Sequence, residues 1–138
     1  METVHAEIEL INGADFQMAR RQVIGDDEVR SIRVRMLVDS GSYLMAINEN
    51  IQAYLDLPFQ YKEPAVLADG SVVRYDVVGP IEVRFANRRG TCNAFVLPGD
   101  SEPLLGAIPM EEMDVVIDMQ RQELAVNPLH PDGAVLRI

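Results

Sequence analysis

The chain has 138 residues, of which 48% are hydrophobic and 25% are charged, as in one globular domain rather than a disordered segment. Its formal net charge of -10 argues against nucleic acid and anionic membranes as partners, since both bind through clustered cations. No stretch approaches the roughly 20 apolar residues of a membrane span, and the N-terminus lacks the basic and apolar regions of a signal peptide. We therefore expect a single cytoplasmic domain over residues 1–138.

The few cysteine and histidine residues limit the chemistry further. A lone cysteine, Cys92, excludes an internal disulfide and a multi-cysteine zinc site. Only His5 and His130 could join Cys92 as metal ligands, so the sequence predicts no metal centre and no cofactor. We expect both histidines to be surface residues and Cys92 to be a small packed hydrophobe in a strand.

Alternation of apolar and polar residues predicts strands in the first half of the chain, at 4–10 and 32–38. Residues 12–28 lie between them, with turn signals at each end, and their middle is expected to form a further strand. A short helix is predicted at 48–57, where Asn48 is a suitable N-cap and Pro58 stops the helix.

In the second half, Asp69-Gly70 lies between two apolar runs, which is a strong signal for the turn of a β-hairpin. A separate alternating strand is expected at 81–85, and "NRRG" is expected to be a turn with Arg88 and Arg89 at its solvated tip. The remaining elements are expected to be a strand in "TCNAFVL", a short helix beginning near Pro109, strands in 114–118 and 122–127, and an extended tail at 128–138.

Many short strands, two short helices and a turn about every ten residues predict an all-β fold, either a closed barrel or a Greek-key-like assembly. An apolar strand, a glycine-containing turn and a helix occur at 34–55 and again at 94–113. Two related halves are therefore possible.

The segment "RVRMLVDSGSYLMAI" places an acidic residue, Asp39, at the end of an apolar strand. Asp39-Ser40-Gly41 on its own is typical of a surface turn. Here, however, both arms are apolar, so the carboxylate is expected to be partly buried. Burying a charge is costly unless the charge is paired or neutralised. One solution is a second carboxylate that shares a proton with the first.

"LVDSGSYLMAI" resembles the active-site signature of aspartic proteases. "EPLLGAIPMEEM" resembles the second signature of that family, and "VLADGSVVRYDVVGPIEV" occupies the place of its flap hairpin. The chain length and the single Asp-Ser-Gly resemble the retropepsin-like, single-domain bacterial and archaeal type. This resemblance implies a closed retropepsin-like barrel with two short helices, active as a two-fold homodimer.

The resemblance also implies a function and a set of site residues. The function is a homodimeric aspartic endopeptidase, in which Asp39 of each chain activates a water molecule that hydrolyses a peptide bond. A peptide-binding module of the same fold, without proteolytic activity, is the alternative. The partners implied are a peptide or protein substrate and a second copy of the chain. Asp39, Ser40 and Gly41 would form the catalytic loop, and the hydroxyl of Ser42 is expected to donate to Asp39. The residues implied to bind substrate are Ser42, Ala68, Asp69, Gly70, Ser71, Leu105 and Gly106.

Overall fold

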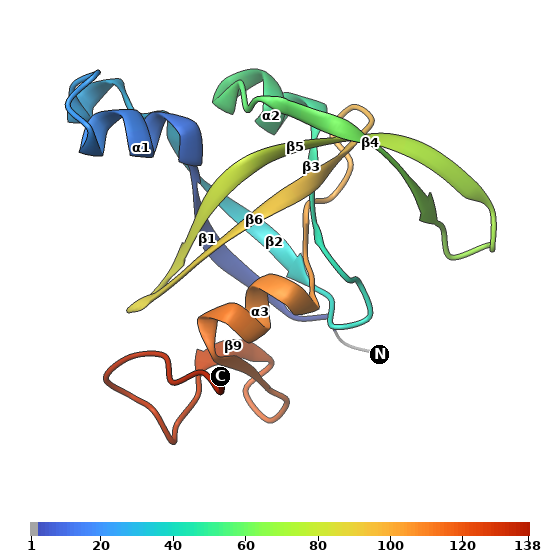
Figure 1. The fold of residues 1–138 in the computed structure, drawn as a ribbon. Coiled ribbons are helices and arrows are strands. Elements are labelled where there is room, and N and C mark those ends of the chain that lie inside the picture. Colours follow the sequence, from blue (N-terminus) through green and yellow to red (C-terminus); the bar gives the residue numbers. More distant parts are fainter. Residues whose placement is uncertain (1–2) are drawn as a thin grey trace.

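The computed structural model describes residues 3–138 as a mostly β structure with short helices (Figure 1). The strands are β1 (His5–Asn12), β2 (Ser31–Val38), β3 (Met45–Asn48), β4 (Phe59–Val66), β5 (Val72–Phe85), β6 (Arg88–Leu97), β7 (Leu104–Leu105), β8 (Val115–Asp118) and β9 (Glu123–Val126). The helices are α1 (Gly13–Arg20), α2 (Glu49–Leu55), α3 (Ala107–Met113) and a short 3-10 turn, η1 (Asp26–Glu28).

Seven strands form one sheet in the order β1-β2-β7-β3-β6-β5-β4, and β8 pairs with β9 separately. Strand β1 also pairs with β5, so the pairings from β1 through β2, β7, β3, β6 and β5 return to β1. Strand β4 lies outside this circuit and pairs with β5 as a hairpin that extends away from the rest of the sheet (Figure 1).

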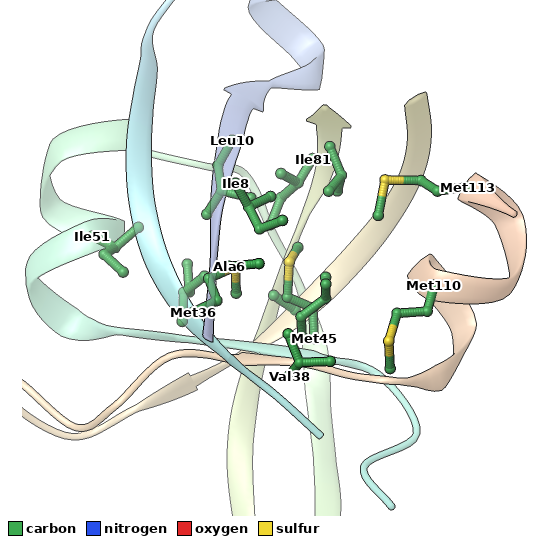
Figure 2. Close-up of a cluster of buried hydrophobic side chains, with 14 of the residues drawn as sticks. Ala6, Ile8, Leu10, Met36, Val38, Met45, Ile51, Ile81, Met110 and Met113 are labelled. Carbon is green, nitrogen blue, oxygen red and sulfur yellow. The ribbon is translucent and has the colours of Figure 1, made fainter. Parts of the chain in front are cut away.

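Alternate residues of the strands fill the core (Figure 2). Ala6, Ile8 and Leu10 of β1 point inward, and Ile8 and Leu10 are fully buried. Met110 and Met113 of α3 close one side of the same cluster. Each fully buried Leu or Ile side chain contributes about 1.5–3 kcal/mol. This packing therefore fixes the register of β1 on β2, and with it the end of β2.

The prediction of a strand within residues 12–28 is wrong, because this segment begins with helix α1. Asn12 accepts a hydrogen bond from the backbone N–H of Asp15 at 3.0 Å, which caps the first turn. The described part of the chain therefore has three α-helices rather than the two predicted. Helix α2 follows its N-cap Asn48 as expected, and α3 begins at Ala107, two residues before Pro109.

The second half of the hairpin is longer than predicted. Strand β5 runs without interruption through the segment at 81–85 that we expected to be a separate strand, with a register shift against β6 between Val78 and Ile81. The turn after it lies at residues 86–87. "NRRG" is therefore mostly strand rather than turn.

Arg88 is not the solvated tip that we predicted. Its side chain is buried and donates to the backbone carbonyls of Asp114 and His130, so its charge is compensated inside the protein. Arg89, the next residue on the strand, is exposed. The alternation of side chains along β6 explains why two adjacent arginines differ so strongly.

The C-terminal segment, residues 127–138, forms no helix or strand but is tied to the body of the protein. The carboxylate of Asp114 accepts hydrogen bonds from the side chain of Asn127 at 3.0 Å and the backbone N–H of Val135 at 3.1 Å. It also contacts His130 Nδ1 at 2.7 Å. His5 likewise pairs with Glu102. Both histidines are thus partly buried against a carboxylate rather than free at the surface.

None of the helices within residues 3–138 combines the length and the apolar character needed to cross a membrane.

Candidate active site

The loop that carries Asp39 begins where β2 ends and is held by its own backbone. The N–H of Asp39 donates to the carbonyl of Leu105 at 2.9 Å, and the N–H of Ser42 donates to the carbonyl of Asp39 at 3.1 Å. The N–H of Gly41 donates to Asp39 Oδ1 at 3.0 Å. The half-buried carboxylate therefore has one oxygen fixed by the loop itself.

Strand β7 and the start of α3 lie directly behind this loop. Val38 pairs in parallel with Leu105, and the N–H groups of Ala107 and Ile108 donate to the carbonyls of Ser42 and Tyr43 at 2.8 and 3.0 Å. The two segments that resemble family signatures are therefore adjacent in space. Strands β3 and β6 are also parallel, so the two segments that we considered related halves pack against each other.

Gly106 is where the two segments approach most closely. A Cβ atom at this position would lie 2.7 Å from the carbonyl oxygen of Ser42 and closer still to that of Leu44. Its φ of -94° is one that any residue can adopt, so space rather than conformation requires glycine. At Gly41, in contrast, a Cβ would meet only Asp39 Oδ1, at 3.2 Å. Within one chain, the need for glycine is thus much stronger at position 106 than at position 41.

A cavity of about 650 Å³ lies between the Asp39 loop and the β4–β5 hairpin. Residues 41–44 form its side nearest Asp39, and hairpin residues 61, 63–67 and 75 lie across from them. The remaining wall consists of Ala46, Phe95, Leu97 and Leu104. This volume is in the usual range for sites that bind small molecules.

The structure brings only some of the predicted site residues to this cavity. Gly41 and Ser42 line it, and Asp39 lies immediately beside them, while Ser40 is exposed. Leu105 and Gly106 are buried behind the loop, so within this chain they support the site rather than face the cavity. The predicted hairpin residues at 68–71 are exposed and do not line the cavity.

The hairpin tip is a compact five-residue loop. Leu67 and Ser71 close it by a backbone hydrogen bond of 2.8 Å, and Gly70 takes a positive φ of 86°. Asp69 accepts hydrogen bonds from the hydroxyl and the N–H of Ser71, which lower the pKa of its carboxyl group. Asp69 therefore stabilises the tip as a charged residue.

The expectation for the Ser42 hydroxyl is wrong in this chain. Ser42 Oγ donates to the carbonyl of Leu44 at 3.3 Å rather than to Asp39. The donor to the carboxylate of Asp39 within the described chain is instead the N–H of Gly41, one residue earlier.

The sequence reasoning missed the aromatic residues of the cavity. Tyr61, Tyr75 and Phe95 line it, and the rings of Tyr75 and Phe95 pack edge to face with centroids 6.4 Å apart. The signal available was the alternation of side chains in the hairpin, which puts Tyr61 and Glu63 on one face of β4.

Other chemistry has little support in the described part of the chain. Burial raises the pKa of the Cys92 thiol to about 12, which makes it a poor nucleophile. Among residues 3–138, no group of three or more histidine, cysteine or acidic side chains is placed to hold a metal ion. Two carboxylates thus belong to this region: Asp39 lies beside the cavity, and Glu63 lines it.

No protein-family model matches the chain. No curated protein sequence matches it either. Among 125 similar chains of known structure is the retroviral protease-like domain of Ddi1 from Leishmania major, with a TM-score of 0.54 and 14% sequence identity. The match covers 92% of this chain and 91% of that domain. The chain therefore has a retropepsin-like fold.

Proposed function

We propose that the protein is an aspartic endopeptidase that acts as a two-fold homodimer. The observation that carries this proposal is the position of Asp39, on a loop braced by Leu105 and Gly106 and beside the cavity under the β4–β5 hairpin. One chain supplies one such aspartate, so a catalytic pair requires Asp39 from two chains. The closed barrel, the single domain and the cytoplasmic location expected from the sequence belong to the same proposal.

The mechanism follows from bringing two carboxyl groups together. Two carboxylates within hydrogen-bond distance cannot both be ionised, so the pair shares one proton. The ionised carboxylate takes a proton from a bound water molecule, whose oxygen attacks the carbonyl carbon of the peptide. The protonated carboxyl group gives its proton to the carbonyl oxygen. The carboxyl group that took the proton from water then gives it to the nitrogen, and the other, now ionised, takes a proton from one hydroxyl of the resulting gem-diol. The C–N bond breaks and the pair again shares one proton, without a covalent intermediate.

The remaining residues would orient this pair and the substrate. Gly41 fixes one oxygen of Asp39 within its own chain, and Ser40 is exposed, where it can reach the partner loop. Residues 68–71 at the hairpin tip are also exposed, where they can close over a peptide and exclude water.

The central test is the substitution Asp39→Asn. We expect hydrolysis of a diverse peptide mixture, read by mass spectrometry across acid to neutral pH, to fall by about 10²–10⁴-fold, since a general base is lost. The circular dichroism spectrum should not change, because the substitution is nearly isosteric. Asp132→Asn, in the exposed C-terminal tail, is the matched control and should cleave normally. Cleavage retained in Asp39→Asn would refute the mechanism.

A peptide-binding module without proteolysis is the second candidate. One observation favours it: an isolated chain has a cavity under an extended hairpin that suits a peptide, but only half of a catalytic pair. If wild type binds peptides but cleaves none at any pH, this candidate replaces the first.

A further inference from the structure

We infer that the cavity under the hairpin selects a basic side chain of the bound peptide, lysine or arginine, and that Glu63 is the residue that determines this preference. The inference rests on the proposed peptide substrate and adds its chemical class. It is carried by the charge of the cavity wall, by the aromatic rings around it, and by the two different faces of the hairpin.

Glu63 is the only charged side chain among the described residues that line the cavity. It pairs directly with Tyr75 across the hairpin, and residues opposite each other in an antiparallel pair share one face of the sheet. No hydrogen bond or ion pair within residues 3–138 involves its carboxylate. The charge is thus available to an occupant of the cavity.

The cations of the hairpin lie on its other face. Lys62 pairs with Asp76 at 2.6 Å, and these two residues are also directly opposite each other. Alternation along β4 therefore keeps Lys62 away from Glu63. Glu63 is exposed and no lysine or arginine of the described chain lines the cavity, so a cationic group of a ligand would supply the complement that the wall lacks.

Aromatic rings surround the same space. Three of the four tyrosines of the chain, Tyr43, Tyr61 and Tyr75, line the cavity together with Phe95. Ring faces attract ammonium and guanidinium groups, and the apolar wall suits the methylene stem of a long basic side chain. An uncharged side chain of the same length would gain only the contact with the apolar wall.

The test measures binding independently of cleavage, in the Asp39→Asn background. Acetylated, amidated octapeptides carry one lysine at each position in turn, and matched peptides carry norleucine, which has an uncharged stem, or glutamate instead. Affinities are measured by calorimetry at low salt for the Asp39→Asn protein and for versions that also carry Glu63→Gln or Glu63→Lys. Asp76→Asn removes a carboxylate from the other face of the same hairpin and is the matched control.

We expect the lysine peptide to bind about fivefold or more tightly than its norleucine counterpart at one position, as for a partly exposed ion pair with a cation–π contribution. Glu63→Gln should abolish that preference, Glu63→Lys should reverse it toward glutamate, and Asp76→Asn should retain it. Equal affinity for lysine and norleucine at every position, or a preference that survives Glu63→Gln, would overturn the inference. If the preference is present but wild type cleaves none of these peptides, the inference stands and the proteolytic proposal fails. Cleavage without the preference supports the proteolytic proposal and overturns the inference.

Discussion

Gly106 is a residue whose identity is set by its neighbours rather than by its backbone angles. A methyl group there would collide with the carbonyls of Ser42 and Leu44, which belong to backbone that cannot rotate away. We expect Gly106→Ala to lower the free energy of unfolding by about 1–3 kcal/mol, as for other overpacked sites, and to reduce peptide hydrolysis by displacing the Asp39 loop. Urea denaturation and cleavage assays measure the two effects.

Gly133→Ala is the control for this substitution. A Cβ at Gly133 would meet no atom within 4 Å, so the free energy of unfolding should change little. Equal stability of Gly106→Ala and Gly133→Ala would mean that β7 and the Asp39 loop are less closely packed than the structure indicates.

Asp114 makes the free energy of unfolding depend on pH in the acid range. Hydrogen bonds from Val135, Asn127 and His130 lower the pKa of its carboxyl group from an ordinary value of 3.8 to about 2. A lowered pKa in the folded state stabilises the fold above the unfolded value, and this stabilisation is lost as the pH falls through the folded value. We expect the Asp114→Asn protein to have a lower urea midpoint than wild type at pH 5. The two midpoints should converge as the pH falls toward about 2.

Other carboxyl groups titrate in the same range, so the difference between the two proteins carries the information. Asp132→Asn, in the tail that Asp114 anchors, should follow the wild-type curve. A gap between Asp114→Asn and wild type that stays constant from pH 5 to about 2 would show that the charge of Asp114 contributes nothing.

Among the elements, α1 and α2 are joined by one buried side chain. Asn12 caps α1, and its amide nitrogen donates to the carbonyls of Leu55 at 2.9 Å and Asp56 at 3.3 Å, where α2 ends. Asn12→Ala removes a helix cap and leaves a buried carbonyl without its donor. We expect a loss on the order of 2 kcal/mol in the free energy of unfolding. Asn87→Ala, at an exposed turn, should cost much less, although Asn87 also donates to a carbonyl. Comparable losses for the two substitutions would argue against the burial of this link.

The elements that the sequence predicted correctly are those with strong local signals. Alternation located β1 and β2, Asp69-Gly70 located the hairpin turn, and Asn48 located the start of α2. Local signals failed for α1 because its cap, Asn12, is also the last residue of a strand. They failed for Arg88 because the groups that compensate its charge come from residues 114 and 130, far along the chain.

The candidate site, like the fold, was predictable only where local sequence signals were strong. The apolar arms around Asp39 and the second glycine segment indicated two pieces of backbone, and the structure places them together at Gly106. The part of the cavity wall outside the hairpin was not predictable, because Phe95 reaches it through the pairing of β3, β5 and β6. The expectation that Ser42 donates to Asp39 was wrong because its hydroxyl donates to the carbonyl of Leu44, and the N–H of Gly41 donates to the carboxylate.

At the scale of the whole molecule, a catalytic pair shared between two chains can be tested by mixing. We expect inactive Asp39→Asn protein, equilibrated with an equal amount of wild type at concentrations that saturate dimer formation, to lower wild-type activity to about half, because random pairing places half of the wild-type chains in mixed dimers. Peptide cleavage follows the activity, and sedimentation equilibrium follows the mass.

Asp132→Asn mixed with wild type is the control and should leave the specific activity unchanged. If activity is independent of added Asp39→Asn protein although mixed dimers form, each chain carries a complete site of its own, and the shared pair is excluded.

The hydrogen bond from the N–H of Asp39 to the carbonyl of Leu105 has a consequence for how the protein is made. During synthesis the ribosome releases the Asp39 loop long before β7 and α3, which brace it, have left the exit tunnel. Contacts between such distant parts of a chain form late, since the loop between them must first be closed. The nascent protein therefore carries an unbraced Asp39 loop until residues 104–113 have also emerged, and any catalytic activity can appear only after that point.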